Sequence, residues 1–408
     1  GDQSVAIGTE ALLVQNPSGN ADMNNVAVGY RSGYAVTTGI NNTLIGGLAG
    51  DAITTGASNT AVGMNALSLN TTAADNTAVG TSALAANTTG TNNTGLGRAS
   101  LSANTTGASN TAVGRDALLS NTTGANNVAV GQAALDANTT ADNNTAVGRD
   151  ALTTNTTGAN NTAVGYTALS ANTTASNNTA VGYNALLTNS TGASNTAVGY
   201  QSMKLNTTGY NNVAVGFASL YNNTTALQNS ALGYYSLLVN TTGSANTALG
   251  YGTLAQNTTG ASNTAVGDNS MGLTTTGPNN VAVGRYSLDA NTTGGGNVAI
   301  GYNALSTNTT ASANTAVGQA SLILNTTGTN VCAFGNDSGY QNTTGSGNTF
   351  IGRASGLLNT TGSYNCFVGQ STAAGTASGY YMTTGSKNTI LGAYSGNQGG
   401  LDMRTVSN

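Results

Sequence analysis

Residues 161–174 read Asn-Thr-Ala-Val-Gly-Tyr-Thr-Ala-Leu-Ser-Ala-Asn-Thr-Thr, and versions of this phrase recur along the chain. The glycine that closes Asn-Thr-Ala-Val-Gly stands at positions 29, 46 and 63, and it returns every 17 residues up to position 369. Gly8 precedes this run by 21 residues and Gly392 follows it by 23, which makes 23 copies. Self-similarity at a fixed short period indicates a solenoid.

Each copy is too short for a helical hairpin, and its apolar residues do not recur at helical spacing. Two short strands and two turns fit a copy, so the sequence predicts an all-β parallel β-solenoid with 17-residue coils and two short strands per coil. Stacked at ~4.8 Å, the coils give a rod on the order of 110 Å long. We expect regular coils over residues 29–369, one or more irregular coils over 1–28, and an irregular coil and tail over 370–408.

The composition offers little for a conventional core or an active site. Charged and aromatic residues each make up 5% of the 408 residues, with 57 Gly and no His or Trp. The lack of His removes the commonest general base and zinc ligand, and we expect no catalytic residue, metal or cofactor. Nine Lys and Arg are too few for a nucleic-acid interface. No apolar run is long enough to span a membrane.

Three polar features of the repeat have structural interpretations. Asn stands four residues before the Gly in 21 of 23 copies, with Ser4 and Val331 as exceptions. We call this the Asn column, and its stacked amides can bond to one another along the axis. The Thr-Thr pair, as in Thr88-Thr89, is usually followed by Gly and predicts a turn in which Gly90 supplies a positive φ. The Gly that closes the phrase predicts the other turn.

Three apolar columns decide which side of the coil faces inward. The Val column directly precedes the Gly, the Ala column precedes it by two residues, and the Leu column follows it by four. Neighbours on a strand point to opposite faces, so the Val and Ala columns cannot share a side. Where the Leu column has a small residue, a large one follows in the Ala column. The pairs are Gly33 with Leu44, Gly339 with Phe350, Gly356 with Phe367, and Ala373 with Ile390, whereas Gly50 precedes Ala61 and breaks the rule.

Because volume lost in the Leu column reappears in the Ala column, these two columns are expected to fill the lumen. The Val column then points outward as an aliphatic stripe on the order of 100 Å long, too large to remain exposed. The simplest cover is the same stripe on sister chains around a symmetry axis, and we favour a homotrimer. The expected inter-subunit seam comprises Val62, Val79, Val113, Val130, Val147, Val164, Val181, Val198 and Val215.

The phrases Ser4-Val5-Ala6-Ile7-Gly8, Asn25-Val26-Ala27-Val28-Gly29 and Asn297-Val298-Ala299-Ile300-Gly301 resemble the repeat of YadA-like heads. These heads belong to trimeric autotransporter adhesins. The resemblance implies a left-handed parallel β-roll assembled as an intertwined or side-by-side homotrimer. The 17-residue units are also similar to repeat regions of phage tail-fibre-like proteins, and they are longer than the usual YadA-like copies.

The position directly after the Gly is the best candidate for a binding surface. We call it the aromatic column, because six consecutive coils place a ring there: Tyr166, Tyr183, Tyr200, Phe217, Tyr234 and Tyr251. Stacked rings could form a platform for a host-surface glycan or a flat protein receptor. Alternatively, they only stabilise neighbouring coils.

Other polar residues allow weaker interpretations. Asp116 and Asp150 share one column two coils apart, a spacing that nominally touches the range of inverting glycosidases, although a solvated surface pair is favoured. Cys332 and Cys366 also lie two coils apart, beyond the reach of an intrachain disulfide, so they are interpreted as small apolar substitutes, with a bridge between chains left open. Asn-Thr-Thr is formally an N-glycosylation sequon, but a turn is favoured.

These features favour a non-enzymatic extracellular fibre or adhesin segment, a rigid rod for attachment at a cell or virion surface. A phage tail fibre that binds a receptor is the main alternative. An ice-binding solenoid is a further one, since Thr stands three residues before the Gly in most copies, interrupted by Val128, Val213, Val281 and Val298. A polysaccharide depolymerase that uses Asp116 is the remaining alternative.

Overall fold

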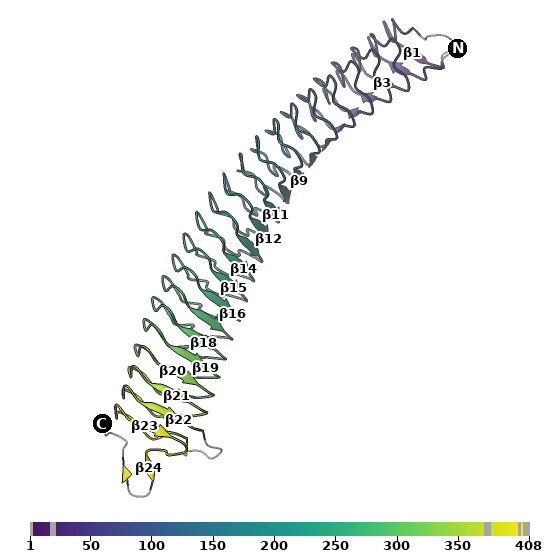
Figure 1. Cartoon of the computed structure of the whole chain (residues 1–408). Coiled ribbons are helices and arrows are strands. Elements are labelled where there is room, and N and C mark those ends of the chain that lie inside the picture. Colours follow the sequence, from purple (N-terminus) through teal and green to yellow (C-terminus); the bar gives the residue numbers. More distant parts are fainter. Residues whose placement is uncertain (1–2, 17–21, 371–376, 399–400, 403–408) are drawn as a thin grey trace. The chain divides into compact units, whose positions relative to one another are not determined.

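The structure is a computed structural model that describes all residues except 1–2, 17–21, 371–376, 399–400 and 403–408 (Figure 1). The chain divides into two compact units, Gly1–Thr208 and Gly209–Asn408, and the division falls inside the stretch of regular repeats. The described residues contain strands and turns and no helix. The all-β fold expected from the repeat is therefore confirmed.

The first unit contains one three-residue strand per coil, and each strand ends at the residue before the closing Gly. The strands are β1 (Val5–Ile7), β2 (Val26–Val28), β3 (Thr43–Ile45), β4 (Thr60–Val62), β5 (Thr77–Val79), β6 (Thr94–Leu96), β7 (Thr111–Val113), β8 (Val128–Val130), β9 (Thr145–Val147), β10 (Thr162–Val164), β11 (Thr179–Val181) and β12 (Thr196–Val198).

The second unit continues the same pattern and adds a short antiparallel pair. Its strands are β13 (Val213–Val215), β14 (Ser230–Leu232), β15 (Thr247–Leu249), β16 (Thr264–Val266), β17 (Val281–Val283), β18 (Val298–Ile300), β19 (Thr315–Val317), β20 (Cys332–Phe334), β21 (Thr349–Ile351), β22 (Cys366–Val368), β23 (Thr389–Leu391), β24 (Asn397–Gln398) and β25 (Leu401–Asp402).

Within each unit, successive coils pair their strands in parallel and in register. Between β10 and β11, for example, Ala163 lies opposite Ala180 and Val164 opposite Val181, so identical columns meet. The same register joins β14 to β15 in the second unit. The 17-residue coil of a parallel β-solenoid, predicted from the spacing of the glycines, is thus confirmed.

The prediction of two strands per coil is wrong, because each coil has one. After the closing Gly, the sign of φ alternates from residue to residue. Asn65 has φ 60° and Leu67 has φ 52°, in the left-handed region that extended strands avoid. This run still bonds to the next coil, since the N–H groups of Leu67 and Leu69 donate to carbonyl oxygens at 3.0 Å. The second side of the coil is therefore a stack of turns.

The closing Gly forms a turn for which side chains leave no room. Gly165 has φ 136°, and a Cβ placed on it would lie 2.4 Å from the carbonyl oxygen of Gly182 in the next coil. The other predicted turn differs from expectation. Gly90 after the Thr pair does not take a positive φ, which belongs instead to Asn92 at 59°. Glycine is required at position 90 because the next coil lies close: an added Cβ would lie 2.3 Å from the carbonyl oxygen of Gly107.

The lumen is filled by the Ala and Leu columns, as expected. Ala163 and Leu169 are fully buried, and so are most of their counterparts along both units, whereas Ala6 in β1 is exposed. Added Cβ atoms show how volume is shared: one on Gly33 would lie 2.7 Å from Leu44, and one on Gly50 would lie 2.8 Å from it. Leu44 thus fills the space that leucines at positions 33 and 50 would otherwise occupy, one before it and one after it in the sequence. Gly50, which broke the rule in the sequence, obeys it in space.

The second unit repeats this exchange of volume. Phe350 occupies the space beside Gly339 and Gly356, where added Cβ atoms would lie 2.6 and 2.4 Å from its ring. Phe367 occupies the space beside Gly379, at 2.4 Å. Ala373, expected to play this part, lies outside the described residues, and Gly379 takes a position of this kind after the longer connection.

Two ladders of buried asparagines run along each unit. In the Asn column, Asn110 donates from its backbone N–H and its side chain to Oδ1 of Asn93, at 3.0 and 3.2 Å. This is the ladder predicted from the sequence. The second ladder, which the sequence analysis did not assign, is formed by the Asn before the Thr pair. Asn104 Nδ2 donates to Asn87 Oδ1 at 2.8 Å and to the Gly107 carbonyl at 2.9 Å.

Candidate functional site

The outward side of the strands forms a uniform surface within each unit, and we call it the strand face. It consists of the Val column and of the residues three before the Gly, the outer Thr column, while the Ala column between them points inward. Every position of the strand face in β1–β23 holds Thr, Ser, Cys or an apolar residue, and none holds a charge. The surface is therefore unusually poor in groups that favour water.

The nine predicted seam valines all lie on the strand face, in β4, β5 and β7–β13. Each is partly exposed in the single chain. Larger members of the same column are more exposed, among them Leu232 at 48% and Phe334 at 43%. The outward direction of the Val column thus agrees with the sequence analysis, whereas its contact with a sister chain remains a proposal.

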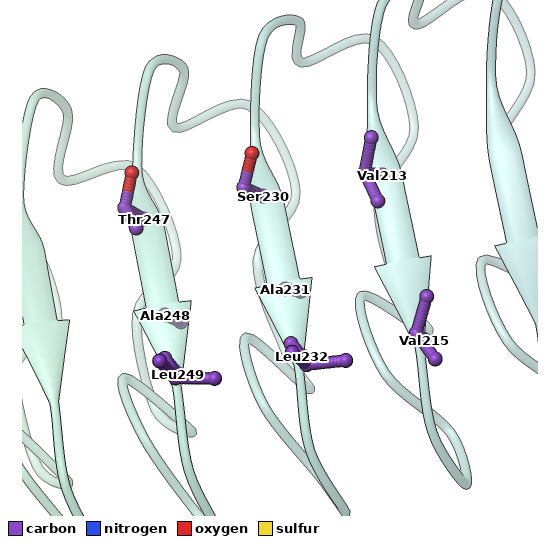
Figure 2. Close-up of a pocket in the computed structure, with 8 residues that line it drawn as sticks. All are labelled: Val213, Val215, Ser230, Ala231, Leu232, Thr247, Ala248 and Leu249. Atoms are coloured by element: carbon purple, nitrogen blue, oxygen red, sulfur yellow. The ribbon is translucent and has the colours of Figure 1, made fainter.

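The second unit has a shallow apolar groove on its strand face, with a volume of about 340 Å³ (Figure 2). Its floor is formed at Ala231 and Ala248, one wall by the outer Thr column and the other by the Val column. The lining residues are Val213, Val215, Ser230, Ala231, Leu232, Thr247, Ala248 and Leu249. The groove runs along the stacking direction across β13–β15, so any occupant contacts several coils.

The aromatic column forms stacked rings within each unit. Tyr183 lies between Tyr166 and Tyr200, with ring centroids 5.4 and 5.2 Å apart and planes within 12°. In the second unit Tyr234 lies between Phe217 and Tyr251, at 4.9 and 5.4 Å. All six rings are exposed. Because stacking turns ring faces toward one another, the column presents mainly ring edges and hydroxyl groups to a ligand.

Two residues flank these rings: Arg149, which stands in the same column of the sequence, and Tyr235, which was missed in the sequence. The Arg149 guanidinium lies 5.9 Å from the centroid of Tyr166, within cation–π range. Tyr235 packs beside Tyr234 with centroids 4.1 Å apart, and a hydrogen bond with Tyr235 raises the pKa of Tyr234. The adjacent Tyr-Tyr pair was the available signal. The aromatic surface is therefore broader at Tyr234 than a single column.

The two candidate glycosidase carboxylates are held in ion pairs. Asp116 lies 3.2 Å from Arg115 Nε and 3.7 Å from Arg98 Nη2, and Asp150 lies 3.1 Å from Arg149 Nε. The arginines are more than half exposed, as expected for a surface arrangement. In the described part of the chain, no group of three His, Cys, Asp or Glu could hold a metal.

Asp136, which the sequence analysis did not single out, has the more unusual environment. Burial raises the pKa of its carboxyl group, and the hydrogen bond from Thr153 at 2.8 Å lowers it in part. The charges of Asp150 and Asp116 raise this pKa further. None of these causes is a nearby cation. Partial burial therefore disfavours the charged form of this carboxyl group.

The remaining candidates have structural explanations. Cys332 and Cys366 are free, lie in the outer Thr column, and are partly exposed, and burial raises the pKa of the Cys332 thiol. The sequon asparagines, such as Asn87, are fully buried and bonded in the second ladder. A glycan on this buried side-chain nitrogen would displace its hydrogen bonds in the folded chain, so the turn interpretation of Asn-Thr-Thr is favoured. The outer Thr column that suggested ice binding is only partly exposed in most coils.

No described segment forms a helix that is both long and apolar enough to cross a bilayer. Comparisons with protein-family models and with curated proteins gave no match to this chain.

Proposed function

We propose that this chain is a non-enzymatic structural segment of an extracellular fibre or adhesin, assembled as a homotrimer through the strand face. The observation that carries the proposal is the strand face itself: an aliphatic column of nine seam valines and their larger counterparts, with no charge in β1–β23. Removing partly exposed aliphatic side chains from water favours association. The resemblance to YadA-like heads supports three chains and a left-handed coil.

The fibre role is supported by the polar groups of the coils, which serve to hold the structure together. Their buried polar groups are tied into ladders that hold neighbouring coils together, as Asn110 and Asn93 illustrate. Asp116 and Asp150 are engaged by arginines, so we assign no catalytic residue. A repetitive segment of this kind suits attachment at the surface of a cell, or at the surface of a virion as a receptor-binding tail fibre.

The assembly is tested by sedimentation of the full chain and of Val164→Asp/Val181→Asp. The native chain is expected to sediment as a trimer, and the variant as a folded monomer, because two charges per chain cannot be buried in the seam. Thr157→Asp/Thr174→Asp is the matched control, with the same charges at exposed turn positions, and it is expected to remain trimeric. A native chain that sediments as a monomer contradicts the proposal.

The aromatic column is proposed as the receptor surface of the fibre, with a host-surface glycan or protein as its partner. Its exposed rings, the Tyr hydroxyl groups and Arg149 support this choice. We expect Tyr166→Ser/Tyr183→Ser/Tyr200→Ser to lose most binding on a panel of immobilised glycans and host-cell proteins. Tyr210→Ser/Tyr364→Ser removes two exposed rings outside the column and serves as the control. Equal binding by both variants argues against this surface.

Ice binding is a second candidate, and one observation favours it. In β9–β12 the strand face repeats Thr and Val without interruption, in register from coil to coil. A strand face buried in a trimer cannot also bind ice, so the two functions exclude each other. Thermal hysteresis by a monomeric protein, abolished by Thr162→Lys/Thr179→Lys, supports ice binding. A trimer without thermal hysteresis supports the fibre.

A polysaccharide depolymerase is the least supported alternative. Its test is the release of reducing ends from a host polysaccharide, which Asp116→Asn is expected to abolish if Asp116 acts as a catalytic carboxylate.

A further inference from the structure

The second ladder of asparagines is interrupted at one coil inside the second unit. Before the interruption, Asn257 Nδ2 donates to Asn240 Oδ1 at 2.8 Å. After it, Asn308 Nδ2 donates to Asn291 Oδ1 at 3.1 Å. The coil between these two parts has Thr274 where the asparagine would stand. A Thr side chain ends at the γ position, so it lacks the amide oxygen and nitrogen with which Asn bonds to both neighbouring coils.

The interruption leaves buried polar groups without partners. Asn257 Oδ1 and Thr274 Oγ1 belong to fully buried residues, and neither atom has a hydrogen bond within the described part of the chain. Asn291 Nδ2 donates one hydrogen to the Gly294 carbonyl oxygen at 3.0 Å, and its second hydrogen has no asparagine oxygen to meet in the preceding coil. Buried polar groups are rarely left unpaired, because each one has lost its hydration.

The neighbouring coils do not move together to close this space. The N–H of Thr258 donates to the Thr275 carbonyl oxygen at 2.9 Å, and the N–H of Thr275 donates to that of Thr292 at 3.0 Å, so the turns keep their usual contacts. An added Cβ on Gly260 would lie 2.8 Å from the carbonyl oxygen of the next coil, which is farther than at most other turns of this kind. The missing amide atoms therefore leave a small space lined by polar groups.

Another interruption of the same ladder shows what a filled space looks like. Asn359 Oδ1 is also buried and without a partner in the described residues, and Met382 stands where the next asparagine would be. Met382 is fully buried and long enough to fill its surroundings, and it has no donor for the oxygen. At Thr274 the side chain is short and polar instead. Polar cavities hold water, whereas cavities that stay empty are apolar.

We propose that one water molecule occupies the space at Thr274 and joins the two parts of the second ladder. The water accepts the second hydrogen of Asn291 Nδ2, donates to Asn257 Oδ1, and forms its third hydrogen bond with the Thr274 hydroxyl group. Three hydrogen bonds are typical of a buried water. A cation suits the site less, because Asn291 presents an N–H donor to it. The site lies within one chain, so the inference is independent of the proposed homotrimer.

The water is counted on the full chain by magnetic relaxation dispersion of water nuclei, which detects long-lived internal water. Thr274→Asn restores the amide, and we expect it to remove one long-lived water per chain. The matched control is Thr276→Asn, which makes the same change at an exposed turn position and should leave the count unchanged. Thr274→Ser keeps both the hydroxyl group and the space, so it should retain the water, and it replaces the native chain in the comparison if needed.

A crystal structure of the full chain locates the water directly. We expect an isolated peak within hydrogen-bond distance of all three groups, and no such peak in Thr274→Asn. The direct amide bond in this variant should also slow hydrogen exchange of the backbone amides around position 274 by about fivefold.

Two results overturn the proposal. One is an unchanged water count in Thr274→Asn together with a native structure in which Thr274 Oγ1 bonds directly to Asn257 Oδ1. The other is a peak that scatters anomalously after K⁺ is exchanged for Rb⁺, which identifies a cation in place of water. Either result leaves the proposed function of the chain untouched, because the fibre is tested by sedimentation.

Discussion

Asn110 donates its backbone N–H and its side-chain amide to the same atom, Oδ1 of Asn93, one coil earlier in the chain. Its Nδ2 also donates to the carbonyl oxygen of Gly124 at 2.8 Å. One side chain thereby joins three consecutive coils. The amide is fully buried, so each lost bond leaves a polar atom without water.

Asn110→Ala is expected to destabilise the fold, because it leaves Asn93 Oδ1 without the donor on the side chain and removes the acceptor for the Asn127 N–H. Each buried polar atom left unpaired costs about 1–3 kcal/mol. Chemical denaturation measures the loss. Thr123→Ala, at an exposed turn position, is the control and should change stability by less than about 0.5 kcal/mol. Equal losses would show that the ladder contributes nothing specific.

Gly165→Ala is expected to disrupt folding more than any surface substitution. The new Cβ would lie 2.4 Å from a backbone oxygen of the next coil, and the φ of 136° is strained for any L side chain. The readout is the yield of soluble protein together with its thermal unfolding. Gly47→Ala is a matched control, because it lies beside a closing Gly and has nothing within 4 Å of an added Cβ. A stable Gly165→Ala protein contradicts the proposed close approach of the turns.

Phe350→Ala is expected to cost about 3–5 kcal/mol, because it opens a cavity between two coils. Gly339→Leu in the same chain should recover part of this loss, since Leu refills the space and Leu in this column already takes a positive φ elsewhere, as at Leu67. Gly339→Leu alone should destabilise the protein by overpacking against Phe350. The double-mutant cycle is measured by denaturation. Additive effects would show that the two positions do not share space.

The stability of the fold is expected to fall as the pH rises through the titration of Asp136. Burial raises the pKa of this carboxyl group in the folded chain, so the folded state holds the proton over a range in which the unfolded state has lost it. Stability is greatest below the ordinary pKa of Asp and is lost above it, up to the raised value. Thermal unfolding against pH should show this slope, and Asp136→Asn should remove it. Asp75→Asn at an exposed position is the control, and an unchanged slope in Asp136→Asn assigns the effect elsewhere.

The repeat predicted the solenoid because most copies place Ala inside and every copy places an apolar residue outside, and stacking neighbouring coils buries so narrow a strand. The volume rule carried over into space for Gly33 with Leu44 and for Gly339 with Phe350, whereas Gly356, expected to pair with Phe367, lies beside Phe350. Gly50 precedes Ala61 in the sequence, but the space beside it is filled by Leu44, which stands six residues earlier.

The second strand of each coil could not be judged from the pattern. Leu67 and its counterparts are apolar and lie at regular spacing, which favours a strand, yet their φ is positive. The type of a side chain indicates whether it is buried, but it does not reveal the sign of φ when a Leu takes a conformation that it usually avoids. The second Asn ladder could not be predicted from the residue pattern either. Asn87 belongs to a familiar turn phrase, and only the stacking of coils shows that its amide is buried.

At the candidate surfaces, the stacking of Tyr183 followed from the 17-residue period, and the outward direction of the Val column followed from the compensating volumes in the Leu and Ala columns. The groove at Ser230 and the environment of Asp136 depend on differences between neighbouring coils, which a consensus averages away.

In-register pairing has a consequence for how such a chain can change over generations. Inside either unit, a deletion or duplication of one 17-residue segment rejoins identical neighbours, so every ladder closes again across the junction. Unequal recombination can therefore lengthen or shorten the solenoid by whole coils, while the hydrogen bonds between neighbouring coils are kept.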